Sequence, residues 1–97
     1  IMQTMTTFEF QAKPNESENL LAFFKRILPQ TKEFPGNKGA KVFRRSESQF
    51  MIFLDWENEG NLTKYLEWRE ERGDFSVLLS FLESAPSITT YQSVECF

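Results

Sequence analysis

The segment from Asp55 to Phe75 carries side chains that a helix covering a core does not need. It reads DWENEGNLTKYLEWREERGDF and brings two tryptophans, a tyrosine and two arginines close together. Aromatic rings can stack on a flat ligand while a few polar groups orient it. An arginine can stabilise the oxyanion that forms when a phenol loses its proton. The segment therefore predicts a pocket wall for a hydroxylated aromatic molecule.

Helical geometry divides these side chains between different faces. At about 100° per residue, Leu62 and Leu66 share one direction, the predicted core face, with Arg69 close by. A second stripe beside them contains Asn61, Tyr65, Trp68 and Arg72. Three glutamates lie away from both and should be solvated: Glu67, Glu70 and Glu71.

These positions lead to a site hypothesis and to a structural alternative. In the hypothesis, Tyr65 and Arg69 are catalytic, and the substrate-binding residues are Trp56, Trp68, Arg72 and Asn61. In the alternative, Trp56 closes a core, Tyr65 and Trp68 cover a barrel edge or a dimer seam, and the arginines pair with nearby glutamates. Arg72 is also within helical reach of the indole of Trp68, on which it could stack.

Composition excludes several classes of function. The sequence has no histidine, which removes histidine-based general bases, triads and metal sites within one chain. Cys96 is the single cysteine, so no internal disulfide is possible. With no phosphate-binding glycine motif either, we expect no metal, haem or flavin cofactor.

Charge and hydropathy indicate where the protein works. The formal charge is −3 and no basic block is present, so nucleic-acid binding is not expected. No apolar run approaches the roughly 20 residues of a membrane span, and no signal peptide is recognisable. We expect a cytoplasmic protein with no membrane association.

The periodic segments predict one α+β domain over residues 1–97. Alternation predicts strands over 5–13, 40–45, 50–57 and 87–95. A first helix should start after an Asn15 cap and bend or close at Pro29. A second helix is predicted over 60–72, followed after Gly73 by a continuation capped by Asp74. Strand, helix, strand, strand, helix, strand is the ferredoxin-like order with a four-stranded antiparallel sheet.

The strand predicted over 50–57 is apolar on both faces. Phe50, Ile52, Leu54 and Trp56 alternate with Met51 and Phe53. The helices of one chain can cover only one face of the sheet, so the other face needs a different cover. This pattern predicts a homodimer in which two sheets pack together.

The chain also resembles a known family. TKEFPGNKGAKVFRR followed by MIFLDWENEGNLTKYLEW is similar to the antibiotic biosynthesis monooxygenase superfamily of dimeric α/β barrels. There too, a first helix leads into a turn like FPG and a strand hairpin that ends in a tryptophan, here Trp56. A helix with a pattern like NLTKYL follows.

The resemblance implies two functions from different classes. One is a cofactor-independent monooxygenase acting on a hydroxylated aromatic, quinol-like or polyketide-like molecule. The other is a non-catalytic dimeric module of the same fold that binds a small ligand or acts in stress. The haem-degrading branch of the superfamily uses a helical histidine, whereas the matching region here offers Tyr65, so haem degradation is not expected.

Overall fold

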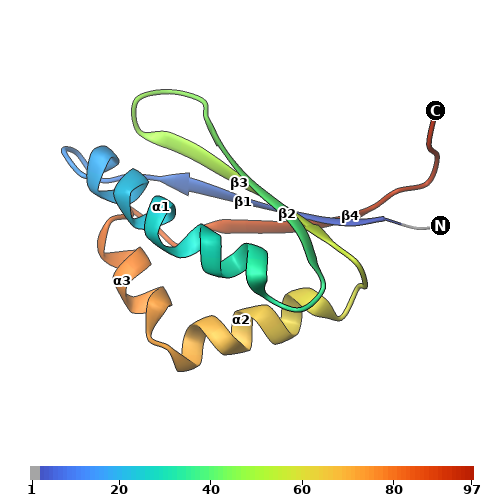
Figure 1. Cartoon of the computed structure of the whole chain (residues 1–97). Helices are drawn as coiled ribbons and strands as arrows, with labels where there is room; N and C mark the ends of the chain where they lie inside the picture. The colour runs from blue at the N-terminus through green and yellow to red at the C-terminus, as the bar shows by residue number, and fades with distance from the viewer. Residues whose placement is uncertain (1–2) are drawn as a thin grey trace.

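Four strands and three helices follow one another in the predicted order (Figure 1). The computed structural model describes residues 3–97. The elements are β1 (Thr4–Gln11), α1 (Ser17–Glu33), β2 (Asn37–Arg44), β3 (Gln49–Trp56), α2 (Asn61–Glu71), α3 (Asp74–Ser80) and β4 (Ser87–Gln92). All strand pairs are antiparallel, so the α+β, ferredoxin-like prediction is confirmed.

The sheet has the order β2-β3-β1-β4, which places the first strand of the chain in its interior. β1 pairs with β3 on one side and with β4 on the other. The three helices lie on one face of this sheet (Figure 1). The two outer strands, β2 and β4, form its edges.

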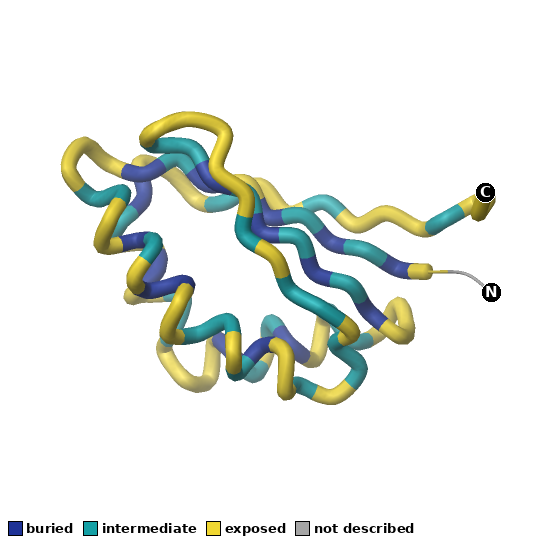
Figure 2. Tube along the Cα trace, turned by 45° about the horizontal axis from the view of Figure 1, so that its top comes forward, coloured by how far each residue is buried: buried dark blue, intermediate teal, exposed yellow. Residues whose placement is uncertain are grey.

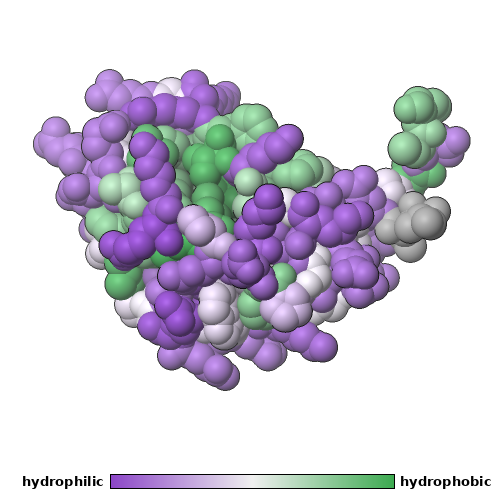
Figure 3. All heavy atoms as spheres, in the orientation of Figure 1, coloured by the Kyte–Doolittle hydropathy of each residue, from purple (hydrophilic) through white to green (hydrophobic). Residues whose placement is uncertain are grey.

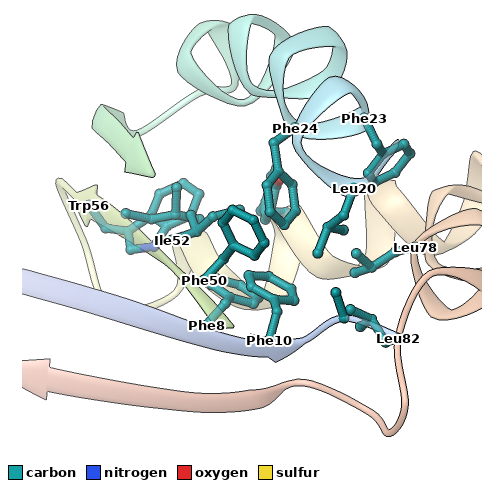
Figure 4. Close-up of a cluster of buried hydrophobic side chains, with 13 residues drawn as sticks. Phe8, Phe10, Leu20, Phe23, Phe24, Phe50, Ile52, Trp56, Leu78 and Leu82 are labelled. Carbon is teal, nitrogen blue, oxygen red and sulfur yellow. The ribbon is translucent and has the colours of Figure 1, made fainter. Parts of the chain in front are cut away.

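Alternation along the strands creates the core on the helical face. Buried and half-buried residues alternate through β3, and the central strands show this period in Figure 2. Phe8, Phe10, Phe50 and Ile52 point from the sheet toward Phe24 of α1 in Figure 4. The interior is therefore mostly aromatic, and it holds many of the eleven phenylalanines of the chain.

The opposite face of the sheet has no cover within the described part of the chain. Met51 and Phe53 of β3 lie on it and are half-buried. Phe43 and Tyr91 lie on the same face and are 48% and 50% exposed. We call this surface, with Met5, the open face.

Several predicted boundaries are wrong in detail. Asn15 does not cap α1: it adopts a left-handed conformation with φ 66°, and the helix starts at Ser17 after Glu16. Pro29 does not close α1, which continues to Glu33. β4 ends at Gln92, three residues earlier than predicted.

The predicted break between the second helix and its continuation is confirmed. Gly73 has φ 78°, a left-handed value that glycine adopts without steric cost. The predicted cap is wrong, because Gly73 is the N-cap and Asp74 is the first residue of α3, with its carboxylate bound to Arg69 and Arg72. The continuation is shorter than predicted, since α3 ends at Ser80. Within residues 3–97, no helix is both long and apolar enough to cross a membrane.

Candidate functional site

The buried face of α2 is formed by Tyr65 and Arg69, one helical turn apart. Tyr65 is 5% exposed and Arg69 only 2%. Leu62 and Leu66, which the helical pattern predicts at the core, are half-buried. The most buried side of the helix therefore lies between the leucine face and the aromatic stripe, at Tyr65 and Arg69.

All the N–H groups of the Arg69 guanidinium are used inside the protein. Arginine carries five such donors, and each has an acceptor between 2.8 and 2.9 Å away. Nε donates to the Tyr65 hydroxyl. The other acceptors are Gln30 Oε1, Asp74 Oδ2, the Ile27 carbonyl and Thr31 Oγ1. As the side chains stand, Arg69 has no donor free for a ligand.

The hydroxyl of Tyr65 is also engaged on both sides. It lies 2.7 Å from Thr31 Oγ1 of α1 and accepts the Nε–H of Arg69. Thr31 Oγ1 in turn accepts from Nη2 of Arg69, and Thr31 is fully buried. Tyr65, Thr31 and Arg69 thus form a closed hydrogen-bond network between α1 and α2.

Asp74 neutralises the buried guanidinium. Its Oδ2 lies 2.8 Å from Arg69 Nη1 and 3.3 Å from Arg72 Nε. The left-handed Gly73 turns the chain so that Asp74 faces back toward α2. The arginines thus pair with the first residue of α3, whereas the structural alternative pairs them with Glu67, Glu70 or Glu71.

Four aromatic rings pack together where the end of α1, the end of β3 and α2 meet. Phe34, Trp56, Tyr65 and Trp68 have neighbouring ring centroids between 5.1 and 6.5 Å apart. The guanidinium carbons of Arg69 and Arg72 lie 4.6 and 5.0 Å from the Trp68 ring centroid. The predicted stacking of Arg72 on Trp68 is therefore present.

A small apolar cavity lies beside the Arg69 network. Its volume is about 40 Å³, and its walls include Phe24, Leu54, Tyr65, Arg69 and Leu78. A buried water needs roughly 10–15 Å³ of such space, whereas sites for drug-sized ligands occupy about 300–1,000 Å³. This cavity can hold a molecule of the size of dioxygen or water, but an aromatic ring requires it to widen.

Asn61 stands apart from the cavity, at the start of α2. Its Oδ1 accepts the backbone N–H of Asn58 at 2.7 Å, and its side chain lies against Gly36. A Cβ atom at Gly36 would overlap the Asn61 carboxamide. Of the six predicted site residues, the structure gathers Trp56, Tyr65, Trp68, Arg69 and Arg72 in one cluster and gives Asn61 a local role beside it.

Three buried polar side-chain atoms on the helical face of the sheet have no hydrogen-bond partner within residues 3–97. They are Nε1 of Trp56, Oγ1 of Thr6 and Nδ2 of Asn37, which pairs with Trp56 across β2 and β3. Trp56 and Thr6 are only 1% and 0% exposed. Thr4 pairs with Trp56 and Thr6 with Leu54, so Thr6 and Trp56 are diagonal neighbours on adjacent strands. A buried donor without an acceptor is uncommon, so the indole N–H of Trp56 is a polar group that the folded chain leaves unsatisfied.

Most of the Arg69 acceptors carry no signal in the sequence. Gln30 and Thr31 lie 39 and 38 residues away along the chain. The pattern after Gly73 predicts only a capping role for Asp74. Within the described part of the chain, no group of three or more His, Cys, Asp or Glu side chains could hold a metal ion.

Comparison with known proteins identifies the fold. The sequence matches no family model and no curated protein. A protein of unknown function from Nitrosomonas europaea superposes with a TM-score of 0.85 at 18% identity, over 99% of this chain and 93% of that one. An antibiotic biosynthesis monooxygenase gives 0.79 at 10% identity, over 98% and 100% of the two chains.

A mutant of SnoaB, a cofactor-independent oxygenase from Streptomyces nogalater, matches equally closely. The TM-score is 0.81 at 10% identity, and 97% of this chain and 95% of SnoaB are covered. The chain has the antibiotic biosynthesis monooxygenase fold. The structural part of the family resemblance is thereby confirmed. In this chain, the cavity between the helices and the sheet is bordered by Arg69, whose hydrogen-bond donors are all satisfied within the protein.

Proposed function

We propose that the protein is a cofactor-independent monooxygenase of a flat hydroxylated aromatic molecule such as a quinol. The observation that carries the proposal is the position of Tyr65 and Arg69 at the wall of an interior apolar cavity. The unpartnered Nε1 of Trp56 adds a buried donor near the same end of the sheet. An oxygenase described as cofactor-independent shares this fold.

In this proposal the side chains divide the work of binding and activation. Tyr65 orients the phenolic oxygen of the substrate, and Arg69 holds the anion that forms when the phenol loses its proton. Trp56 and Trp68 contact the aromatic ring of the substrate, while Arg72 and Asn61 support the pocket from its outer side. The electron-rich anion passes an electron to dioxygen, so the reaction needs positioning and anion stabilisation from the protein.

The electron balance closes without a further reductant. A quinol and one dioxygen yield a hydroxylated quinone and one water, so one oxygen atom enters the substrate and the other leaves as water. Both electron pairs come from the substrate itself. The cavity of about 40 Å³ accepts dioxygen as it stands, and the quinol enters only when α2 and α3 move away from the sheet.

We further propose that the working form is a homodimer joined through the open face. Met51 and Phe53 lie at its centre, and Phe43 and Tyr91 beside them are about half exposed. Removing a large apolar side chain from water contributes roughly 1.5–3 kcal/mol, so several such residues on each copy favour a second sheet as the cover. Neither a nucleic acid nor a membrane is expected as a partner.

One observation favours the second candidate, a non-catalytic binding module. All donors of Arg69 and the Tyr65 hydroxyl are already satisfied within the protein. A site that must hold a developing anion has donors aimed at the place where the charge forms. If the network never opens, the cluster only stabilises the fold, and ligands bind elsewhere on the dimer.

Oxygen uptake with a panel of quinols separates the two candidates. The parent protein should consume oxygen. With isotopically labelled dioxygen, one labelled oxygen atom should appear in the product and the other in water. Tyr65→Phe, which keeps the ring and removes the hydroxyl, should lower the rate by ~10²–10³ while quinol binding persists in calorimetry. If the parent binds a quinol without consuming oxygen, the binding module is correct. If it neither binds nor oxidises any quinol, both are wrong for this class of molecule.

A further inference from the structure

The strand β2 presents free backbone groups along one edge of the sheet. The N–H of Arg45 donates to the carbonyl of Gln49 at 2.9 Å, just beyond one end of the β2–β3 pair. The N–H of Glu57 donates to Gly36 at 2.8 Å at the other end. Bonded and non-bonded pairs alternate in antiparallel strands, so the register directs the backbone groups of three residues outward: Ala40, Val42 and Arg44.

An apolar groove runs beside this edge, between β2 and α1. It has a volume of about 390 Å³, and its apolar lining includes Leu21, Leu28, Ala40 and Val42. Figure 3 shows hydrophobic side chains gathered in a hollow between these two elements. The volume falls in the range of ligand-binding clefts, and it is open along the free edge of the strand.

The charged residues that line the groove are positive, and the nearby Arg44 of β2 is paired with Glu18 of α1 at 3.1 Å. Lys25 and Lys32 are its only charged lining residues, and both are exposed. Lys41 is exposed on the edge strand β2, with its side chain at the outer edge of the open face, beside the Met51 and Phe53 centre of the proposed dimer contact. This basic strip contrasts with the formal charge of −3 for the whole chain.

We propose that β2 and the groove bind an extended peptide segment in which apolar and acidic residues alternate. Such a segment adds a fifth strand to the sheet through the outward backbone groups. Its side chains point alternately to the two faces. The apolar ones enter the groove beside Val42, and the acidic ones face Lys41 on the other side. Lys25 and Lys32 attract the segment electrostatically.

Charge also decides against a second copy of β2 as the occupant. Pairing two such edges would place Lys41 and its equivalent on the same small surface, where like charges opposite one another are destabilising. Lysines on an edge strand commonly serve to prevent that pairing. Lysines that only prevented edge-to-edge pairing would not need an apolar groove beside them. We therefore infer from the groove that the partner is amphipathic. The inference holds whether or not the interior cavity is catalytic.

The test uses an acetylated and amidated seven-residue peptide of alternating glutamate and valine. A control peptide has the same composition with its glutamates in one block. Calorimetry should detect binding of the alternating peptide only. Amide hydrogen exchange should slow at Ala40, Val42 and Arg44, whose N–H groups point outward, and stay unchanged at Lys41 and Phe43, which already face β3.

Charge reversal supplies the matched variants. The double variant Lys25→Glu and Lys41→Glu should weaken peptide binding by about tenfold. Lys64→Glu, on the exposed surface of α2, should leave it unchanged. Equal binding of both peptides, or binding without slower exchange at Ala40, Val42 and Arg44, would overturn the proposal. The proposal would also be overturned if exchange at these residues slowed with rising protein concentration and did not respond to the peptide. A second copy of the chain would then occupy the edge.

Discussion

Nε of Arg69 donates a hydrogen bond of 2.9 Å to the hydroxyl of Tyr65, and both side chains are buried. Through the same guanidinium, α2 is joined to three positions of α1 and to the first residue of α3. A single side chain therefore connects all three helices that cover the sheet.

Replacing Arg69 by methionine should destabilise the fold strongly. The change leaves Asp74 without its buried partner and removes the donors to Gln30, Thr31 and Ile27. Breaking a buried pair by deleting one member costs about 3–5 kcal/mol, which urea denaturation can measure. Arg72→Met is the control: Arg72 also binds Asp74 but is 45% exposed, so its loss should cost no more than about 1 kcal/mol. Equal losses from the two variants would contradict this view of the network.

Gly36 should tolerate no side chain. It has φ 88°, and a Cβ atom there would overlap the carboxamide of Asn61. We expect Gly36→Ala to lower the free energy of unfolding by about 1–3 kcal/mol. Gly39→Ala is the comparison, because a Cβ at Gly39 meets no atom within 4 Å. A neutral Gly36→Ala would mean that the turn before β2 can rearrange and that Asn61 is free to move.

The open face predicts the mass of the protein in solution. Light scattering at micromolar concentration should give a dimer, and Phe53→Glu should convert it to a monomer because a charge cannot be buried between two sheets without a partner. Leu79→Glu changes a residue that is 45% exposed on α3 and should leave the dimer intact. A parent protein with the mass of a monomer would refute the assembly.

The absence of histidine and of a second cysteine predicts a protein that is isolated without a bound metal, haem or flavin. Elemental analysis and a visible spectrum of the purified chain measure this directly. A stoichiometric Soret or flavin band would show that other side chains of the protein hold a cofactor, and the prediction would then be wrong.

The sheet could be predicted from the sequence because the side chains of a strand alternate between its two faces. In β3 every inward residue is apolar, and in β1 Phe8 and Phe10 follow the inward Thr4 and Thr6 at the same period. The start of α1 could not be predicted. Asparagine is a residue type that commonly caps helices, but Asn15 adopts a left-handed backbone conformation instead. Hydrophobicity alone also predicts Leu62 and Leu66 at the core of α2. Arg69 replaces them there because Asp74 and the acceptors of α1 compensate its charge, and such contacts form only when the helices have docked.

The five clustered residues could be grouped from the sequence because helical spacing determines which side chains of α2 are neighbours. What the spacing could not reveal was that their polar atoms bind one another. Tyr65 forms a hydrogen bond with Thr31, which lies 34 residues away in the sequence. The periodicity within one helix does not show which residues of another helix it will contact.

The position of β1 in the middle of the sheet has a consequence for how the chain acquires its structure. β1 is synthesised before the other three strands of the sheet, yet its two neighbours are β3 and the much later β4. During translation this strand must therefore wait, with one or both edges unpaired, until the last strand has been made. Contacts between such distant segments slow folding, and unpaired strands invite aggregation. Shortening the chain before Ser87 would leave β1 as a permanent edge, so we expect nascent or truncated forms to depend on chaperones far more than the complete sheet does.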